Sequence, residues 1–439
     1  MKLVKLSLAS IVAAGALTSV ASAVSLEEAI KNVDVTGYAR YRFDNQNISL
    51  GPLNNTKNSH RFTSDIDFKA ALDDNFFGVI GFRYDSRDAS GQRVYAATNV
   101  GYYDNSDPDG FGQTFNVRQF YLGYTAGNTT ITAGRQVLGT FFTDDMVGTG
   151  IKVLNSDISG LTLVGMAFDN LQNDIDIGSN VFILGNGYAD VDKNTGHLTR
   201  GSKVERVYDR NLYGVAAIGS YDPVSFQLWY AALDSVAQLY AADVTVGLNF
   251  GDVDLSLQAQ AAGTSMWADS ARAILYEPTQ VPAEYIMWGL ESDDATFLAA
   301  NLGVKGFGFD GSVGYVNINT QDNGYSFISF EDQGGFITAG EDLLDYTLIE
   351  GDLSTYFLRA GYTFANKIRV GADYVGARMK ANEIKNLEPS ITFDAYEVVA
   401  RVDYKYSKKL NFKAWYSYIN IDNNREDMKH LRLEARYNF

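Results

Sequence analysis

The last ten residues of the chain alternate strictly between two kinds of side chain. Apolar residues occupy one face of the expected strand and polar or charged residues the other: Leu431, Leu433, Ala435, Tyr437 and Phe439 against His430, Arg432, Glu434, Arg436 and Asn438. Such a strand separates an apolar medium from water, either in a soluble β-sandwich or in a membrane barrel. A final strand that ends on Phe is typical of the strand that closes a bacterial outer-membrane barrel. We therefore expect such a barrel, with Tyr437 and Phe439 in its membrane girdle and in its assembly.

The N-terminus predicts export from the cytoplasm. Lys2 and Lys5 precede an apolar run over residues 6–17, and a small-residue cleavage site, Ala-Ser-Ala, follows it. The alternative is a first transmembrane helix, but the run is short for that and is interrupted by serine and glycine. We expect a signal peptide over residues 1–23 and a single barrel domain over residues 24–439.

Composition restricts the function classes. The chain is 46% hydrophobic, which is too apolar for a disordered protein, and it has no cysteine for disulfides or thiolate metal sites. Loss of the signal peptide leaves 34 basic against 53 acidic residues, a net charge of −19, so we do not expect a nucleic-acid partner. Most of these carboxylates fit solvated loops. The 28 tyrosines and 26 phenylalanines fit the aromatic girdles of a transmembrane barrel.

Two kinds of connection alternate along the chain. Tight-turn sequences lie at residues 73–75, 126–128, 222–223, 251–252, 306–308, 366–367 and 407–409. Longer polar connections lie near residues 45–59, 88–113, 136–159, 186–209, 263–293, 320–352 and 379–392, with shorter members at 234–240 and 422–428. One end of an antiparallel barrel would therefore carry tight periplasmic turns and the other long extracellular loops.

Placing strands between these connections predicts an all-β, transmembrane antiparallel barrel of 18 strands, with 16 as the fallback. The expected strands are residues 34–44, 60–73, 76–87, 114–125, 129–135, 160–169, 175–185, 210–221, 224–233, 241–250, 253–262, 294–305, 309–319, 353–365, 368–378, 393–406, 410–421 and 429–439. The strand at 175–185 rests mainly on parity, since a strand must cross between its two neighbours.

The faces of the expected strands predict a lumen that holds water. In the hairpin over residues 241–262, Leu248 and Phe250 share an apolar face, while Asp243 and Gln260 lie on the other. Ionised side chains inside a barrel are tolerable only in an aqueous lumen. Aromatic residues also gather beside the tight turns, as a periplasmic girdle would require: Phe76, Tyr221, Phe250, Phe309, Phe364, Tyr406, Phe412 and Phe439.

Residues 25–43, residues 131–136 and the aromatic final strand resemble the Campylobacter-type major outer membrane porin family of epsilon-class bacteria. The resemblance covers the mature N-terminus and the strands and is absent from the long loops. It implies an 18-strand general porin in the outer membrane of a Gram-negative bacterium. The implied partners are a homotrimer of the chain itself, outer-membrane lipid and lipopolysaccharide, with ions and small hydrophilic solutes as cargo.

In porins of this kind the loop after the fifth strand folds into the lumen and narrows it. Here that loop is expected at residues 136–159, with Phe141, Phe142, Asp144, Asp145 and Lys152. The expected constriction sets carboxylates on this loop against arginines on the wall: Asp144 and Asp145 against Arg40, Arg42, Arg83 and Arg135. Such opposed charges would create a transverse field that sorts solutes.

Two alternatives stay open at the constriction. The arginines could simply hold the wall together by pairing with Asp65, Asp67 or Asp85. Arg118 should point outward by the alternation of its strand, unless that strand carries a bulge or a subunit contact.

Catalytic motifs are missing from the sequence. It has three histidines, no GxSxG and no HExxH, so we do not expect an enzyme. Residues 105–110 are similar to part of a calcium loop, but Asn116 stands where the final glutamate belongs. No cofactor is expected to be required, and a divalent cation such as calcium remains an open question.

These observations favour a general diffusion porin. The alternatives are an adhesin or surface antigen anchored by a barrel, and a substrate-specific channel. A substrate-specific channel should show a line of aromatic residues through the pore, and Phe141, Phe142 and Trp229 are too few to establish one.

Overall fold

The computed structural model describes residues 33–50, 53–87, 114–172, 181–183, 205–206, 210–267, 273–275, 294–321, 325–326, 328–330, 333–344, 349–381, 391–422 and 426–439. The expected signal peptide lies outside these residues. None of the helices in the described ranges is both long and apolar enough to traverse a membrane.

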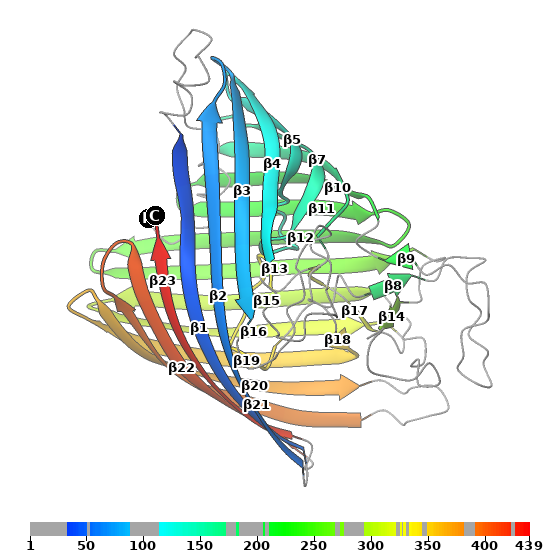
Figure 1. Cartoon of the computed structure of the whole chain (residues 1–439). Coiled ribbons are helices and arrows are strands. Elements are labelled where there is room, and N and C mark those ends of the chain that lie inside the picture. The colour runs from blue at the N-terminus through cyan, green and yellow to red at the C-terminus, as the bar shows by residue number, and fades with distance from the viewer. Residues whose placement is uncertain are drawn as a thin grey trace.

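Eighteen antiparallel strands form one closed sheet (Figure 1). The strands are β1 Asp34–Leu50, β2 Leu53–Ala71, β3 Phe76–Arg87, β4 Thr114–Ala126, β5 Thr129–Val137, β6 Val147–Asn155, β7 Leu161–Asp169, β10 Leu212–Tyr221, β11 Val224–Leu233, β12 Ala237–Phe250, β13 Val253–Met266, β15 Ala295–Gly306, β16 Phe309–Thr320, β19 Asp352–Phe364, β20 Ile368–Ala381, β21 Ile391–Lys405, β22 Leu410–Ile421 and β23 Glu426–Asn438. Each pairs with its neighbours along the chain, which confirms the predicted fold class.

The barrel closes where the last strand meets the first. β23 pairs with β1 in a continuous register from Tyr38 and Asn438 to Ser49 and Asp427 (Figure 1). The terminal Phe439 extends this seam, because its N–H donates to the Gly37 carbonyl at 3.1 Å and its own carbonyl accepts from the Gly37 N–H at 3.2 Å. Closure leaves no unpaired edge in the sheet, as a membrane-spanning sheet requires.

The two faces of the wall are as predicted. In the β12–β13 hairpin, Leu248 and Phe250 are exposed on the outer face, whereas Asp243 and Gln260 are buried on the inner face. Most of the aromatic residues predicted beside the short turns are exposed on the outside: Phe76, Tyr221, Phe250, Phe309, Phe364, Tyr406 and Phe412. Phe439 is half-buried, and Tyr437 of the same strand is exposed. Aromatic side chains at this level suit the boundary between hydrocarbon and water.

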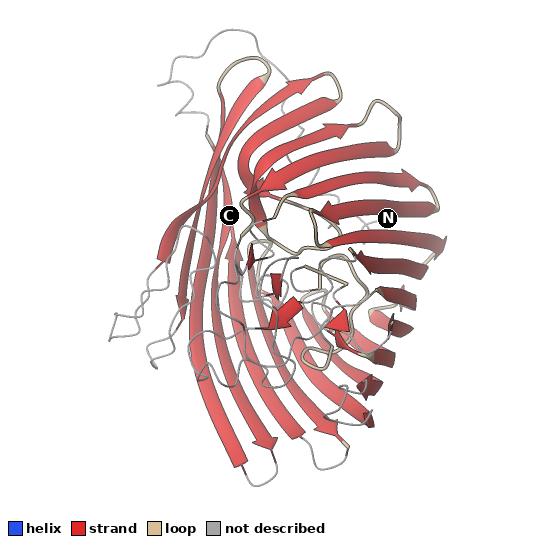
Figure 2. Ribbon diagram, turned by 90° about the vertical axis from the view of Figure 1, so that its right-hand side faces the viewer, coloured by secondary structure: helices blue, strands red, loops and turns tan. Residues whose placement is uncertain are grey.

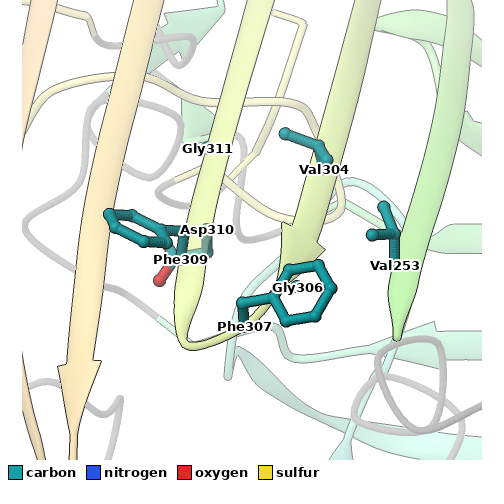
Figure 3. A pocket seen from close by; sticks show the side chains of 7 residues that line it. All are labelled: Val253, Val304, Gly306, Phe307, Phe309, Asp310 and Gly311. Carbon is teal, nitrogen blue, oxygen red and sulfur yellow. The ribbon is translucent and has the colours of Figure 1, made fainter.

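A shallow apolar recess interrupts this outer surface at the β15–β16 turn (Figure 3). The recess has a volume of about 290 Å³ and is lined by the side chains of Val253, Val304, Phe307 and Phe309, among others. Phe307 and Phe309 are both strongly exposed and project beside the turn. The recess therefore belongs to the girdle rather than to the lumen.

The strand count agrees with the prediction, but one strand lies elsewhere in the sequence. β6, at Val147–Asn155, falls inside the expected loop 136–159, so that loop is reduced to residues 138–146. Of the strand expected at 175–185, the structure describes residues 181–183, and these are not in the barrel. Gly148 and Gly150 interrupt the apolar alternation of β6, which conceals it. Gly150 is required by packing, because a Cβ there would lie 2.1 Å from the Ala167 carbonyl oxygen.

Two small sheets are separate from the 18-strand sheet of the wall. Of the residues expected at 175–185, the described ones form β8, Val181–Ile183, which pairs with β9, Glu205–Arg206, and β14, Ala273–Leu275. A second small sheet pairs β17, Tyr325–Ser326, with β18, Ile349–Glu350.

The first hairpin extends further than predicted. Residues 45–59 are expected to form a loop, yet β1 continues to Leu50 and β2 begins at Leu53. Polar side chains pair across this extension: the Asn45 amide donates to Asn58 at 2.5 Å and the Asn47 amide to Thr56 at 2.8 Å. A strand with polar residues on both faces has no alternation for sequence reasoning to detect.

Candidate pore constriction

Two loop segments lie inside the ring of strands (Figure 2). The first inward loop is residues 138–146, between β5 and β6; the second inward loop, as described, is residues 328–330 and 333–344, between β16 and β19. They meet through backbone hydrogen bonds, since the Phe330 N–H donates to the Phe142 carbonyl at 2.7 Å and the Gly335 N–H to the Phe141 carbonyl at 2.8 Å. The loops therefore form one layer.

Aromatic side chains form the middle of this layer. The Phe336 ring packs against Phe141 and against Phe297 of β15, with centroids 4.8 Å apart in both pairs. Gln260 of β13 attaches the second inward loop to the wall, because its amide donates to the Gly335 carbonyl at 3.0 Å and accepts from the Ile337 N–H at 2.8 Å. Phe141 is thus a packing residue between loops, and does not belong to a line of aromatics along the pore.

The first inward loop is attached to the wall by four charged groups. Asp145 of the loop lies 2.5 Å from Arg83 of β3 and 3.0 Å from Arg118 of β4. The same two arginines hold Asp65 of β2, at 2.7 and 2.9 Å. Two guanidinium groups and two carboxylates therefore form a network in which the formal charges cancel. Such mutual pairing offsets the desolvation of charges that are largely buried.

Arg118 reaches this network through a β-bulge. The β3–β4 register pairs Gly81 with Gln119 but Phe82 with Val117, so Arg118 is the extra residue. Arg118 and Gln119 are both buried on the inside, whereas the neighbouring Val117 is exposed on the outside. Of the two explanations considered for Arg118, a bulge or a subunit contact, the structure contains the bulge.

The predicted site residues are only partly brought together. Asp145 contacts Arg83 directly, so no aqueous gap separates this pair. Asp144 is exposed beside it, and the Asp145 side chain is 41% exposed, so both carboxylates border open space inside the barrel. Arg42 of β1 pairs with Glu434 of β23 at 2.9 Å instead of with the loop.

Arg40 and Arg135 lie apart from the loop carboxylates. Arg40 is on the inner face of β1, opposite Arg436 of β23. Arg135 is the cross-strand partner of Phe120, which is 66% exposed on the outside. Because cross-strand partners share a face, Arg135 belongs to the outer surface, where it donates to the Asn170 carbonyl at 3.4 Å.

Lys152, which was expected in the constriction loop, instead binds backbone carbonyls at the end of β5. It lies on β6 rather than in a loop, and its Nζ donates to the carbonyls of Val137 and Leu138 at 2.9 and 3.3 Å. The ammonium group thus fixes the start of the first inward loop.

The second inward loop is anchored by a carboxylate that sequence reasoning missed. Glu397 of β21 has no exposed surface, and its carboxylate accepts three consecutive backbone N–H groups: Glu341 at 2.9 Å, Asp342 at 3.2 Å and Leu343 at 3.2 Å. The Ser417 hydroxyl donates a fourth bond, at 2.6 Å. A buried carboxylate with this many donors is fully hydrogen-bonded.

Gly340 makes this contact possible. Its φ is +73°, and a Cβ there would lie 1.9 Å from a Glu397 carboxylate oxygen. Only glycine allows both the left-handed conformation and the close approach.

Charged side chains fasten the same loop at its edges. Arg401 of β21 lies 2.7 Å from Glu341. The ring of His430, on β23, lies between two carboxylates, 2.8 Å from Asp342 and 3.0 Å from Asp44. Alternation places Glu397 and Arg401 on the inner face, but nothing in the sequence indicates that loop residues 54 to 60 positions earlier return to meet them.

The layer as a whole is charged at both ends and apolar in the middle. One end is attached to β2–β4 and the other to β21–β23. It can narrow the lumen and set the charges that a passing solute meets. Among the described residues no group of three histidine or acidic side chains is arranged to hold a metal ion. The calcium-like residues 105–110 lie outside the described part of the chain.

A protein-family model described as Campylobacter major outer membrane protein matches residues 1–439. A search of curated proteins finds no match. Solved porins share the fold at low identity. OccAB4 of Acinetobacter baumannii is 10% identical, with a TM-score of 0.65 over 92% of this chain and 98% of that one. A BenF-like porin of Pseudomonas fluorescens Pf-5 is 13% identical, with a TM-score of 0.65 over 93% and 99%. OpdK of Pseudomonas aeruginosa, solved with vanillate, is 12% identical, with a TM-score of 0.65 over 92% and 98%.

Proposed function

The chain belongs to the Campylobacter major outer membrane protein family and is an outer-membrane porin channel, and on this premise we propose that it is a general diffusion porin. Its cargo would be ions and small hydrophilic solutes, which move down their gradients without chemical change. The observation that carries the proposal is the inner face, where charged groups of both signs border the inward loops. Two of the carboxylates, Asp144 and Asp145, keep exposed surface inside the barrel, and an exposed charge there needs water around it.

The size of the barrel favours a channel over a mere anchor. Small membrane anchors need far fewer strands, whereas barrels of 16 to 18 strands are wide enough for an aqueous channel. An adhesin role for the long loops would be an addition to this channel.

We assign the constriction to Asp144 and Asp145 on the first inward loop, with Arg83, Arg40 and Arg42 on the wall. The excess of acidic residues favours cations, and the wall arginines oppose it. A weak preference for cations is the expected balance. Arg135 is left out of this assignment because it shares the outer face with Phe120.

The remaining partners follow from the family resemblance. The outer face would contact outer-membrane lipid and lipopolysaccharide, and part of it would be buried in a homotrimer. The signal peptide over residues 1–23 would be removed on export. No cofactor is required by a passive channel.

A substrate-specific channel is the second candidate, since one structural neighbour was solved with vanillate. Liposome swelling separates the two. A general porin should admit uncharged sugars at rates that fall smoothly with molecular size, whatever their stereochemistry. Swelling with one solute class alone, and not with sugars of smaller size, would reject general diffusion.

A further inference from the structure

Two arginines face each other where the barrel closes. Arg40 of β1 and Arg436 of β23 are direct partners in the register, so they share a face of the sheet. That face is the inner one, because the intervening Tyr41 is exposed on the outside. Both arginines are half-buried. Like charges in directly opposed positions repel each other, so the stability of the barrel wall does not explain why two arginines are paired here.

Among the described residues no carboxylate forms a salt bridge with either arginine, although Glu434 attracts Arg40 from a greater distance. The acidic side chains at neighbouring inner positions are each held by another arginine: Asp65 by Arg83 and Arg118, Asp85 by Arg61, and Glu434 by Arg42. Arg436 donates to the Asn438 amide oxygen at 3.0 Å. The Nε of Arg40 is buried without a hydrogen-bond partner in the described structure. Positive charge therefore remains at this point of the wall, and the donors that a solute could reach are the terminal N–H groups of the two half-buried guanidinium groups.

An aromatic ring orients the two guanidinium groups. The Cζ of Arg436 lies 4.0 Å from the Tyr38 ring centroid, and the Cζ of Arg40 lies 5.7 Å from it. Contact with a ring uses the flat face of a guanidinium group. The N–H groups lie in the plane of the guanidinium and are not consumed by this contact. The ring thus supports both groups while leaving their terminal N–H groups for hydrogen bonds.

We propose that Arg40 and Arg436, supported by Tyr38, form a transient binding site for the carboxylate of a small organic solute in the lumen. The proposal rests on the proposed porin function and adds one class of solute to it. A planar group with two oxygens matches the paired N–H donors of a guanidinium, whereas chloride can satisfy only one direction at a time. Half-burial of the arginines strengthens this attraction relative to that of a fully solvated charge.

Substitution by lysine separates binding from simple attraction. Lysine keeps the positive charge but lacks the planar fork of donors. If the pair only attracts anions through its field, Arg40→Lys with Arg436→Lys should leave carboxylate binding as it was. If the pair binds a carboxylate, the double variant should weaken that binding about tenfold. Arg378→Lys is the matched control, because this arginine is 68% exposed and lies in an ion pair with Asp394 at the loop end of β20.

The test is single-channel recording of the full-length protein in planar bilayers, with sodium benzoate as the probe. Benzoate should interrupt the current of the wild type in brief events whose frequency saturates with concentration. In the lysine double variant the half-saturating concentration should rise about tenfold, measured against that variant's own open current. The Arg378→Lys control should match the wild type. Equilibrium titration of the folded proteins with benzoate in detergent supplies a second readout.

Several results would overturn the proposal. Equal block of the wild type and the double variant would show that charge alone acts. Absence of saturable block in the wild type would show that no site exists. Block by inorganic phosphate as strong as that by benzoate would reassign the site to oxyanions in general. A folded barrel that carries no current at all would reject the proposed function, and this site with it.

Discussion

Replacing Glu397 should release the second inward loop from the wall. In Glu397→Ala, the N–H groups of Glu341, Asp342 and Leu343 lose their acceptor. A fully buried donor left without a partner costs about 1–3 kcal/mol, so roughly 9 kcal/mol is the upper bound for the three if the loop stays in place, since the N–H groups of Glu341 and Asp342 are only partly buried. The loop should instead move until water reaches these groups.

Glu397→Gln should have an intermediate effect. The amide keeps one acceptor oxygen but loses its charge and turns an NH₂ group toward backbone donors. Hydrogen bonds to a charged acceptor are worth about twice those to a neutral one, so each surviving bond weakens by about 1 kcal/mol. The loop should then open in a fraction of molecules.

Thiol labelling measures this release directly. The chain has no cysteine, so Ala339→Cys in the second inward loop would be the sole thiol, at a position that is buried. A bulky maleimide should label it slowly in the parent, faster in the Glu397→Gln background and fastest with Glu397→Ala. Asp394→Ala is the control, because this exposed carboxylate forms an ion pair with Arg378 at the strand end and with no other side chain of the described residues. Equal labelling rates in all four proteins would refute the anchoring role of Glu397.

Three further predictions concern the same architecture. Gly340→Ala should loosen the second inward loop by about 1–3 kcal/mol, because the new Cβ meets Glu397 in a left-handed backbone conformation, and the same thiol assay should detect it. Asp144→Arg with Asp145→Arg should shift the reversal potential in a salt gradient toward anions, since two negative charges become positive and Arg83 and Arg118 keep only Asp65 as a partner; an unchanged potential would remove this loop from the constriction. Deletion of Phe439 removes two backbone hydrogen bonds to Gly37, so less protein should reach the compact form in unheated gel samples; a yield equal to wild type would contradict this.

Sequence alternation predicted the wall because each strand residue faces either lipid or water. That constraint acts on single residues, so it can be detected in Leu248 or Asp243 without knowledge of their neighbours. Alternation fails to reveal a strand where glycine stands in place of an apolar or polar side chain, as at Gly148 and Gly150 of β6. It also fails where both faces of the strand are polar, as in the extended first hairpin. It also fails at the bulge that turns Arg118 inward, since one extra residue inverts the pattern.

The site was less predictable than the wall for a different reason. Asp145 and Arg83 were expected to face each other across an aqueous gap, because porins of this kind fold the loop after the fifth strand into the lumen. The structure instead joins the two side chains in an ion pair. The second inward loop depends on Glu397, whose partners are fixed by the path of a long connection. Such a path is decided by packing between Phe141 and Phe336, which are distant in sequence.

The central claim is that the barrel is a water-filled channel narrowed by the two inward loops. Single-channel conductance in symmetric potassium chloride tests it most directly, with the wild type compared against Glu397→Ala. The account predicts discrete, ohmic current steps for the wild type and larger, noisier steps for the variant, because its second inward loop leaves the layer. A wild type without current steps, or a variant whose steps equal those of the wild type, would contradict it.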